Sequence, residues 1–468
     1  MSHLFKLFIA LILVLVPIVG FANNEQQNAE GVQISPEEVQ QQFDEANKIT
    51  IAAAVSTAAY NDRNAQMVKH YLEQNGWKFG TDKEIAEQVN NKFILVKRID
   101  KEGVPVYFLG IAGTENLSDI KKDLRLEKVY FAGVNSRELR DNAETSDVPD
   151  TEPKVHRGFH QITYMQSFCR VKNEQEGNAS ILESLLKEEQ AKIYITGHSS
   201  GGAVAILTAA VLIEAGINPE DIEVITFASP AVGNQAFVDK YKDTIKLTRV
   251  VISGDAVPHM IQKMDGSYKQ FGTEFVQQRS DSAFVDKSHR MYGYLDVSLK
   301  NYYDIRRMAI DNNIEIANRF ETKKIDLGTV YIVPLRNELP HGLQSEFYYM
   351  REAVEDEYDR TIKDYIYETE DIDNVPMILE RARKSGCRVV MVSQAQATMV
   401  KDKLNIYYVT LNQTIYDSEN GSVLNTAIFS TRTQEITPLE AFLHSFKGLN
   451  ASLRQKAVHE TEEIKKAS

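Results

Sequence analysis

The segment 193–202 constrains the fold more than any other part of the chain. It reads Ile-Tyr-Ile-Thr-Gly-His-Ser-Ser-Gly-Gly and is followed by a long apolar run. A short β-run, a Gly-x-Ser-x-Gly turn and an apolar helix in this order predict a sharp strand-to-helix turn with Ser199 at its tip. Glycines are needed at 197 and 201, because side chains two positions from the serine would collide with neighbouring backbone. The sequence therefore predicts a serine presented at the end of a buried strand.

The chain length and the apolar pattern predict two folded units with tails. A chain of 468 residues is too long for one ordinary domain. Around the serine, short β-runs alternate with helical segments, which indicates an α/β sheet of mostly parallel strands with flanking helices, followed by a second, smaller α/β or α+β domain. The predicted divisions are a signal peptide at 1–22, a flexible leader at 23–40, the α/β domain at 41–299, a helical connector at 300–324, a small α+β domain at 325–450 and a charged tail at 451–468.

The amino-terminal residues predict the compartment. Leu7 to Val19 is an unbroken apolar run, and small residues follow where a signal peptidase cleaves. A retained membrane anchor needs roughly 20 apolar residues, so a cleaved signal and a secreted or periplasmic location are the preferred interpretation. The two cysteines, Cys169 and Cys387, indicate neither a disulfide scaffold nor a metal site, and whether they pair stays open.

The charge distribution limits the partners. A formal net charge of −13 argues against nucleic acid, because binding a polyanion requires a basic face and no Lys/Arg cluster of that kind occurs. The acidic segment 346–373 is expected to be a helix with a solvated face.

A nucleophilic serine needs a histidine base and a carboxylate that orients the histidine. Downstream of Ser199, the first acid after a complete β-run is Asp255, in the kind of loop where such an acid belongs. Three histidines compete for the role of base. His198 lies inside the turn and is expected to point away, and His259 follows Asp255 by only four residues. His289 is therefore the preferred base, with His259 as the alternative.

Five further motifs carry a family resemblance. In chain order they are Ala112-Gly-Thr-Glu, Val155-His-Arg-Gly-Phe, Thr226-Phe-Ala-Ser-Pro-Ala-Val-Gly-Asn, Asp255-Ala-Val-Pro and His289-Arg-Met-Tyr-Gly-Tyr. Together with the serine turn, they make roughly residues 45–299 resemble the fungal-type, or class 3, triacylglycerol lipases, which have the α/β-hydrolase fold.

The resemblance implies a role for each matching residue. Ser199 would be the nucleophile, His289 the general base and then acid, and Asp255 the orienting carboxylate. The backbone N–H groups of Ser200 and Thr114 would hold the oxyanion, and the Thr114 hydroxyl could add a bond. The resemblance implies no cofactor and no metal. The segment after Thr114 is more polar than the family's amphipathic lid, so contact with a lipid interface is expected to be transient.

Three hypotheses for the function follow. The leading one is a secreted serine carboxyl-ester hydrolase, a lipase or esterase that acts on an ester or lipid through an acyl-enzyme. A phospholipase or acyltransferase with the same triad is the alternative. A non-catalytic envelope interaction protein with an inactive hydrolase domain is the third, because Asn405 to Phe446 faintly resembles small domains of bacterial envelope proteins. The ligand of that carboxy-terminal domain is not predicted.

Overall fold

The computed structural model describes residues 35–60, 62–79, 93–114, 126–168, 171–173, 177–188, 190–278 and 289–446. By its contacts the chain separates into Met1–Gln33 and Ile34–Ser468, and every described residue belongs to the second unit. The predicted signal peptide and charged tail lie outside the described residues, as does Cys169, whereas Cys387 is buried and free. Within the described ranges, none of the helices combines the length and apolar character that a membrane span requires. The domain divisions stay predictions.

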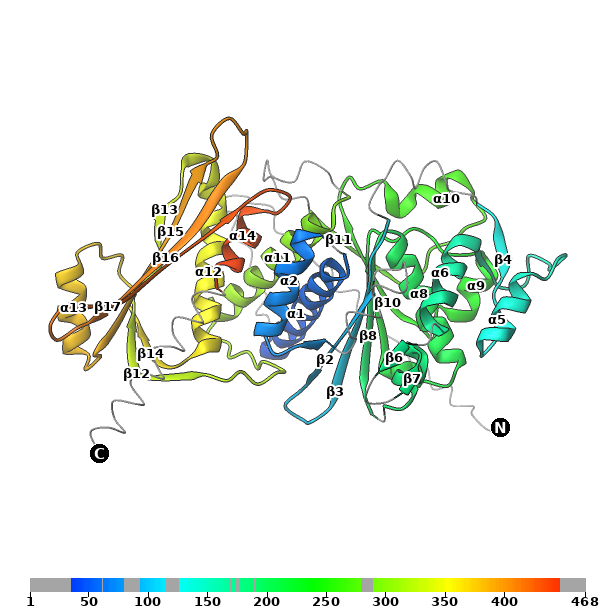
Figure 1. Ribbon diagram of the computed structural model, residues 1–468, viewed down its shortest axis with the longest axis horizontal. Coiled ribbons are helices and arrows are strands. Elements are labelled where there is room, and N and C mark those ends of the chain that lie inside the picture. Colours follow the sequence, from blue (N-terminus) through cyan, green and yellow to red (C-terminus); the bar gives the residue numbers. More distant parts are fainter. Residues whose placement is uncertain are drawn as a thin grey trace, which may run out of the picture. The chain divides into compact units, whose positions relative to one another are not determined.

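A seven-stranded sheet carries the serine turn (Figure 1). In spatial order its strands are β1 (Lys78–Phe79), β2 (Phe93–Ile99), β3 (Pro105–Ile111), β8 (Lys192–His198), β9 (Ile222–Phe227), β10 (Lys246–Ile252) and β11 (Thr273–Gln277). The strands from β3 to β11 run parallel, and β1 and β2 add an antiparallel edge. The sheet is of the α/β-hydrolase type that the sequence predicts, and β2 pairs with β3 along its whole length.

Helices cover both faces of this sheet. Helix α1 (Pro36–Ala58) packs on one face, and α8 (Ser200–Glu214) packs on the other. Because side chains alternate along a strand, neighbouring residues enter different cores. Phe108 belongs to the cluster on the α1 side and Leu109 to the cluster on the α8 side. A Cβ at Gly110 would lie 2.7 Å from the Val55 carbonyl oxygen, so α1 rests directly on β3.

The remaining elements of this part are short. They are α2 (Arg63–Gln74), β4 (Lys128–Tyr130), α5 (Ser136–Ala143), β5 (Lys154–His156), α6 (Arg157–Phe168), β6 (Val171–Asn173), β7 (Gly177–Ala179), α7 (Ile181–Leu186), η1 (Pro219–Asp221), α9 (Gln235–Tyr241), η2 (Val257–His259) and α10 (Met260–Met264).

A second, six-stranded sheet lies in the carboxy-terminal part. Its strands are β14 (Ile362–Tyr367), β12 (Ile325–Ile332), β15 (Val389–Met399), β16 (Tyr407–Asp417) and β17 (Val423–Arg432), with β13 (Arg336–Glu338) paired to β15. The hairpins β15–β16 and β16–β17 are antiparallel. The pairs β12–β14, β12–β15 and β13–β15 are parallel. Its helical elements are η3 (His341–Leu343), α12 (Gln344–Thr361), α13 (Val375–Lys384) and α14 (Pro438–His444).

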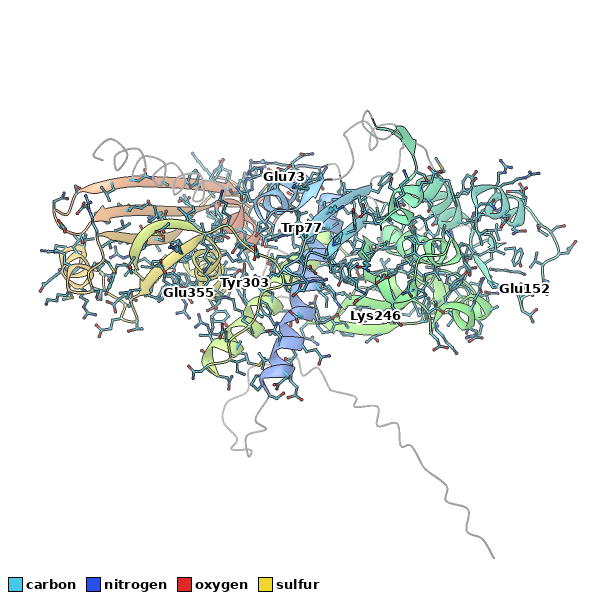
Figure 2. The ribbon with its side chains drawn as sticks, turned by 90° about the horizontal axis from the view of Figure 1, so that it is seen from below. Glu73, Trp77, Glu152, Lys246, Tyr303 and Glu355 are labelled. Atoms are coloured by element: carbon cyan, nitrogen blue, oxygen red, sulfur yellow. The ribbon has the colours of Figure 1, made fainter. Side chains whose placement is uncertain are left out.

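Helix α11 (Met291–Asp311) joins the two parts (Figure 1). It packs against α1 and against α12, and α14 lies between α12 and the second sheet. Buried apolar residues from both parts therefore form one continuous cluster. Trp77 and Tyr303, which are both labelled in Figure 2, belong to this cluster.

The acidic segment 346–373 differs from its expected structure. Helix α12 ends at Thr361, and the chain continues as strand β14. The helix face is also not solvated, because Glu346 and Glu352 are 2% and 0% exposed. Basic side chains of α11 account for this burial: Arg306 Nη1 lies 3.3 Å from Glu352 Oε2. The expectation of a solvated helix face is wrong, because charge alone does not show which partner a helix will have.

Candidate active site

The serine turn has the geometry that the sequence predicts. Ser199 connects β8 to α8 with φ 57° and ψ −127°, a conformation that side-chain-bearing residues rarely adopt. A Cβ at position 197 would lie 2.4 Å from the carbonyl oxygen of Gly201, and one at 201 would lie 2.3 Å from that of Ile111. Glycine is therefore the only residue that both positions accept without a backbone shift. The backbone N–H of Ser199 donates to the Phe227 carbonyl at 2.9 Å, which fixes the turn to β9.

The structure brings together the three side chains predicted to form the triad. His289 Nε2 lies 3.0 Å from Ser199 Oγ, and His289 Nδ1 lies 2.9 Å from Asp255 Oδ2. Ser199 is 1% exposed, and Asp255 and His289 are each 6% exposed. The three residues come from the end of β8, the loop after β10 and the residues just before α11. A continuous hydrogen-bonded path therefore runs from hydroxyl to imidazole to carboxylate among buried side chains.

Asp255 is held by more than the histidine. Its Oδ1 accepts the N–H of Val257 at 2.9 Å, and its Oδ2 accepts the Tyr294 hydroxyl at 2.7 Å. Tyr294 also accepts the N–H of Ile252 at 3.2 Å, so it connects the acid to the end of β10. Burial, followed by the charge of Asp255, raises the pKa of Tyr294 above its ordinary value, which keeps this donor protonated. Sequence reasoning did not assign this role, although Tyr294 lies five residues after His289 in the quoted motif.

His198 contributes to the site in a way that the sequence did not predict. Its ring centroid is 4.7 Å from that of His289, so the expectation that it points away is wrong. Its Nδ1 lies 2.7 Å from the Tyr60 hydroxyl, which also accepts the N–H of Gly113 at 3.1 Å. Burial, followed by the nearby His289, lowers the pKa of His198 well below its ordinary value. A neutral ring therefore packs against the candidate base.

The expected oxyanion donors lie beside the serine turn. The Thr114 N–H donates to Ser200 Oγ at 3.0 Å, and the two hydroxyl oxygens are 3.1 Å apart. A Cβ at Gly113 would lie 2.3 Å from the His198 carbonyl oxygen, so this backbone passes directly over the turn. The Ser200 hydroxyl oxygen thus accepts the hydrogen bond that the Thr114 N–H would give to an oxyanion. The polar segment after Thr114, which corresponds in sequence to the family's lid, lies outside the described residues.

His259, the alternative base, lies elsewhere. It ends η2 and is partly exposed, and the described contacts of Ser199 and Asp255 do not include it. Among the residues that the structure describes, no three His, Cys, Asp or Glu side chains are grouped so that they could hold a metal ion.

Known proteins resemble the part of the chain that contains this site. The family model "Lipase (class 3)" matches residues 108–264, from within β3 to the end of α10. A phospholipase A1-II 2 of Oryza sativa subsp. indica is 24% identical over 256 residues, which are 49% of this chain and 60% of the relative. A lipase of Rhizomucor miehei is 35% identical over 141 residues, 28% of this chain and 37% of the relative. The chain thus spans less than two thirds of the length of either relative.

Solved lipase structures are similar to about half of this chain. The triacylglyceride lipase of Rhizomucor miehei aligns with 50% of this chain and 80% of its own, at 21% identity and a TM-score of 0.36.

The predicted resemblance to class 3 lipases is confirmed over residues 108–264, which the family model matches. These residues include strands β8, β9 and β10 of the seven-stranded sheet. The match includes Ser199 and Asp255 and ends before His289. It does not reach residues 325–450, so the faint similarity of that part to envelope proteins stays a prediction.

Proposed function

We propose that the protein is a secreted serine carboxyl-ester hydrolase, a lipase or esterase. The observation that carries the proposal is the hydrogen-bonded path from Ser199 through His289 to Asp255. Serine is a weak nucleophile at neutral pH, and a base within about 2.6–3.2 Å of its oxygen is the arrangement that activates it. The class 3 lipase match over residues 108–264 supports an ester as the substrate.

The reaction follows from the three side chains. His289 Nε2 accepts the Ser199 proton as Oγ attacks the ester carbonyl, while Asp255 holds Nδ1–H and stabilises the imidazolium. The tetrahedral intermediate collapses, His289 gives the proton to the leaving alcohol, and an acyl-enzyme remains. Water, deprotonated by His289, then attacks the acyl-enzyme, and the proton returns to Ser199 as the carboxylic acid leaves. Tyr294 is a positioning residue in this scheme, because it acts through Asp255.

The oxyanion is proposed to bind to the backbone N–H groups of Ser200 and Thr114. The N–H of Ser200 lies in the first turn of α8, where N–H groups have no acceptor within the helix and negative charge is favoured. The N–H of Thr114 is bonded to Ser200 Oγ, so the Ser200 side chain must turn aside when the oxyanion forms. Losing one such donor typically lowers the rate by about 10²–10³-fold.

A fluorophosphonate probe tests the nucleophile. We expect the full chain to be labelled and the Ser199→Ala variant not to be labelled, because the probe reacts with an activated serine. The adjacent Ser200→Ala variant is the matched control and should keep the label, since its backbone N–H is unchanged. Equal labelling of the wild type and Ser199→Ala, or labelling of neither, would refute the assignment of Ser199 as the activated nucleophile.

The second candidate is a phospholipase or an acyltransferase. The similarity to a phospholipase A1 of Oryza sativa supports it. The same triad serves any acyl donor, so the acyl pocket and the acceptor decide between these reactions. Release of fatty acid from phosphatidylcholine, from tributyrin and from p-nitrophenyl esters, each with and without an added alcohol acceptor, separates the three activities.

Action outside the cytoplasm is part of the proposal and rests on the apolar run at residues 7–19. Amino-terminal sequencing of the protein recovered after expression tests it, and a mature chain that begins just after residue 22 is the expected result.

A further inference from the structure

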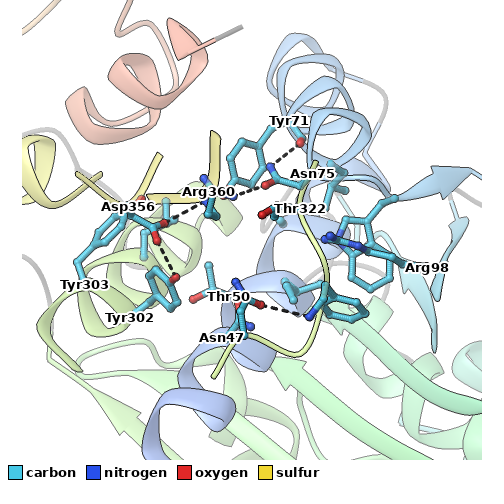
Figure 3. A pocket seen from close by; sticks show the side chains of 17 residues that line it. Asn47, Thr50, Tyr71, Asn75, Arg98, Tyr302, Tyr303, Thr322, Asp356 and Arg360 are labelled. Atoms are coloured by element: carbon cyan, nitrogen blue, oxygen red, sulfur yellow. Dashed lines mark hydrogen bonds and ion pairs between the residues drawn. The ribbon is translucent and has the colours of Figure 1, made fainter. Parts of the chain in front are cut away.

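A cavity of about 60 Å³ lies away from the candidate active site (Figure 3). Its walls come from α1, α2, β2, α11 and α12, with residues 318–322 of the chain that follows α11. Ser199, Asp255 and His289 do not line it. A single water needs only about 10–15 Å³, so the cavity has room for a small molecule.

The first feature that indicates a ligand is Arg98, at the end of β2. Its Nη2 donates to the Glu321 carbonyl at 2.6 Å, and its guanidinium lies over the Phe320 ring, 4.5 Å from the centroid. Among the described residues, no carboxylate pairs with it. Burial, followed by the charge of Arg360, lowers the pKa of Arg98 to about 10. Because Arg98 lies near a second cation and has no carboxylate partner among the described residues, a bound anion there would be stabilised.

The second feature is Arg360, near the end of α12. It donates to Asn75 Oδ1 and to Glu357 Oε2, and both guanidinium groups line the cavity in Figure 3. Its buried Nε is 3.4 Å from Asp356 Oδ2 but makes no hydrogen bond among the described residues. An unsatisfied buried donor beside the cavity is the kind of group that an acceptor in the cavity would satisfy.

Asp356 and Glu357 balance the charge of Arg360, so the uncompensated positive charge at the cavity is that of Arg98. Asp356 is taken up by the Tyr302 hydroxyl at 3.3 Å and by Arg306 Nε at 3.5 Å, besides Arg360. Trp77 and Phe320 are 3% and 5% exposed and make up part of an apolar wall. The remaining polar walls carry neutral amides and hydroxyls, such as those of Asn47 and Thr322.

We propose that this cavity binds a small carboxylate, with its oxygens between Arg98 and Arg360 and its carbon chain against Trp77 and Phe320. Guanidinium groups present a planar fork of donors that matches a carboxylate, and these two groups have donors to spare. The apolar wall and the small volume favour a short aliphatic acid over phosphate. The inference does not depend on ester hydrolysis.

The test measures the melting temperature of the full chain in sodium acetate, sodium butyrate or sodium phosphate, with sodium chloride keeping the ionic strength constant. A ligand that binds only the folded state raises the melting temperature as its concentration exceeds the Kd. We expect a saturable rise with acetate and butyrate and a smaller one with phosphate. The Arg98→Gln variant should need at least tenfold more carboxylate for the same rise.

Two further variants keep the result interpretable. Arg137→Gln removes an arginine from α5 whose side chain is 84% exposed, and it should respond as the wild type does. Ile51→Phe narrows the cavity without touching either arginine, so it should also lose the response and serves if Arg98→Gln does not fold. An unsaturable rise, an equal response of Arg98→Gln and Arg137→Gln, or a stronger response to phosphate than to butyrate would overturn the proposal.

Discussion

The two parts of the molecule bury polar groups in different ways. In the first part, Ser199, His289 and Asp255 meet where strands of an apolar sheet end, and each contact joins one donor to one acceptor. In the second part, charged groups are spread along the contact between α11 and α12. Arg306, for example, forms ion pairs with Glu352, Asp356 and Asp359.

The first arrangement positions atoms for a reaction, whereas the second holds two helices together. A single misplaced atom in the first arrangement breaks the path, because no second group can take its role. In the second arrangement each charged group has several partners. Removing one group still lowers the free energy of unfolding, since an uncompensated buried charge is strongly destabilising. Buried ion pairs as a whole give little net stability compared with apolar packing, so the α11–α12 contact fixes how the helices pair more than how strongly they pair.

The largest expected effect is on activity. His289→Ala should lower kcat by about 10⁴-fold or more, because it removes the proton acceptor of Ser199, whereas His259→Ala should leave kcat within a few fold. Steady-state hydrolysis of a p-nitrophenyl ester measures both. The reverse ranking would move the base to His259 and remove the comparison drawn above.

An intermediate effect is expected on stability. Arg306→Met removes the buried cation that pairs with Glu352 and with Asp356, and it should lower the free energy of unfolding by about 3–5 kcal/mol. Lys363→Met is the control in the same part of the chain. Both partners of its pair with Asp326 are more than half exposed, so its loss should change the free energy of unfolding far less. Urea unfolding measures both, and equal losses would mean that burial does not distinguish the two kinds of pair.

The smallest expected effect concerns pH and His198. The ring stays neutral in the folded state, because burial and then His289 lower its pKa, while in the unfolded chain it takes up a proton near pH 6.5. Its contribution to stability is therefore full above about pH 6.5 and is lost as the pH falls below that value. His198→Gln should reduce the slope of unfolding free energy against pH by up to about 1.4 kcal/mol per unit in that acidic range. Parallel curves for wild type and variant between pH 7.5 and 4.5 would contradict this assignment.

Residues that carry a local pattern could be predicted from the sequence. The serine turn depends on glycines two positions away, and the strands and helices near it show their own periodicity. Ser199, Asp255 and the preference for His289 over His259 could therefore be predicted. The catalytic roles stay a proposal.

Contacts between distant segments could not be predicted in this way. Tyr60 bonds His198 across 138 positions, and no pattern near either residue indicates the other. The acids of α12 looked solvated because their partners lie on α11, 45 to 53 positions away. A single sequence gives the charge of a side chain but not the neighbour that tertiary packing provides.

Helix α11 couples the two parts mechanically. It begins two residues after His289, carries Tyr294 in its first turns, and has Arg306 among the acids of α12 in its later turns. A shortened chain ending at residue 299 would cut this helix in the middle and expose apolar surface that α12 normally covers. Heat inactivation and loss of the carboxy-terminal fold should accordingly occur as one transition, so the far part of the protein sets the temperature range over which the imidazole stays in place.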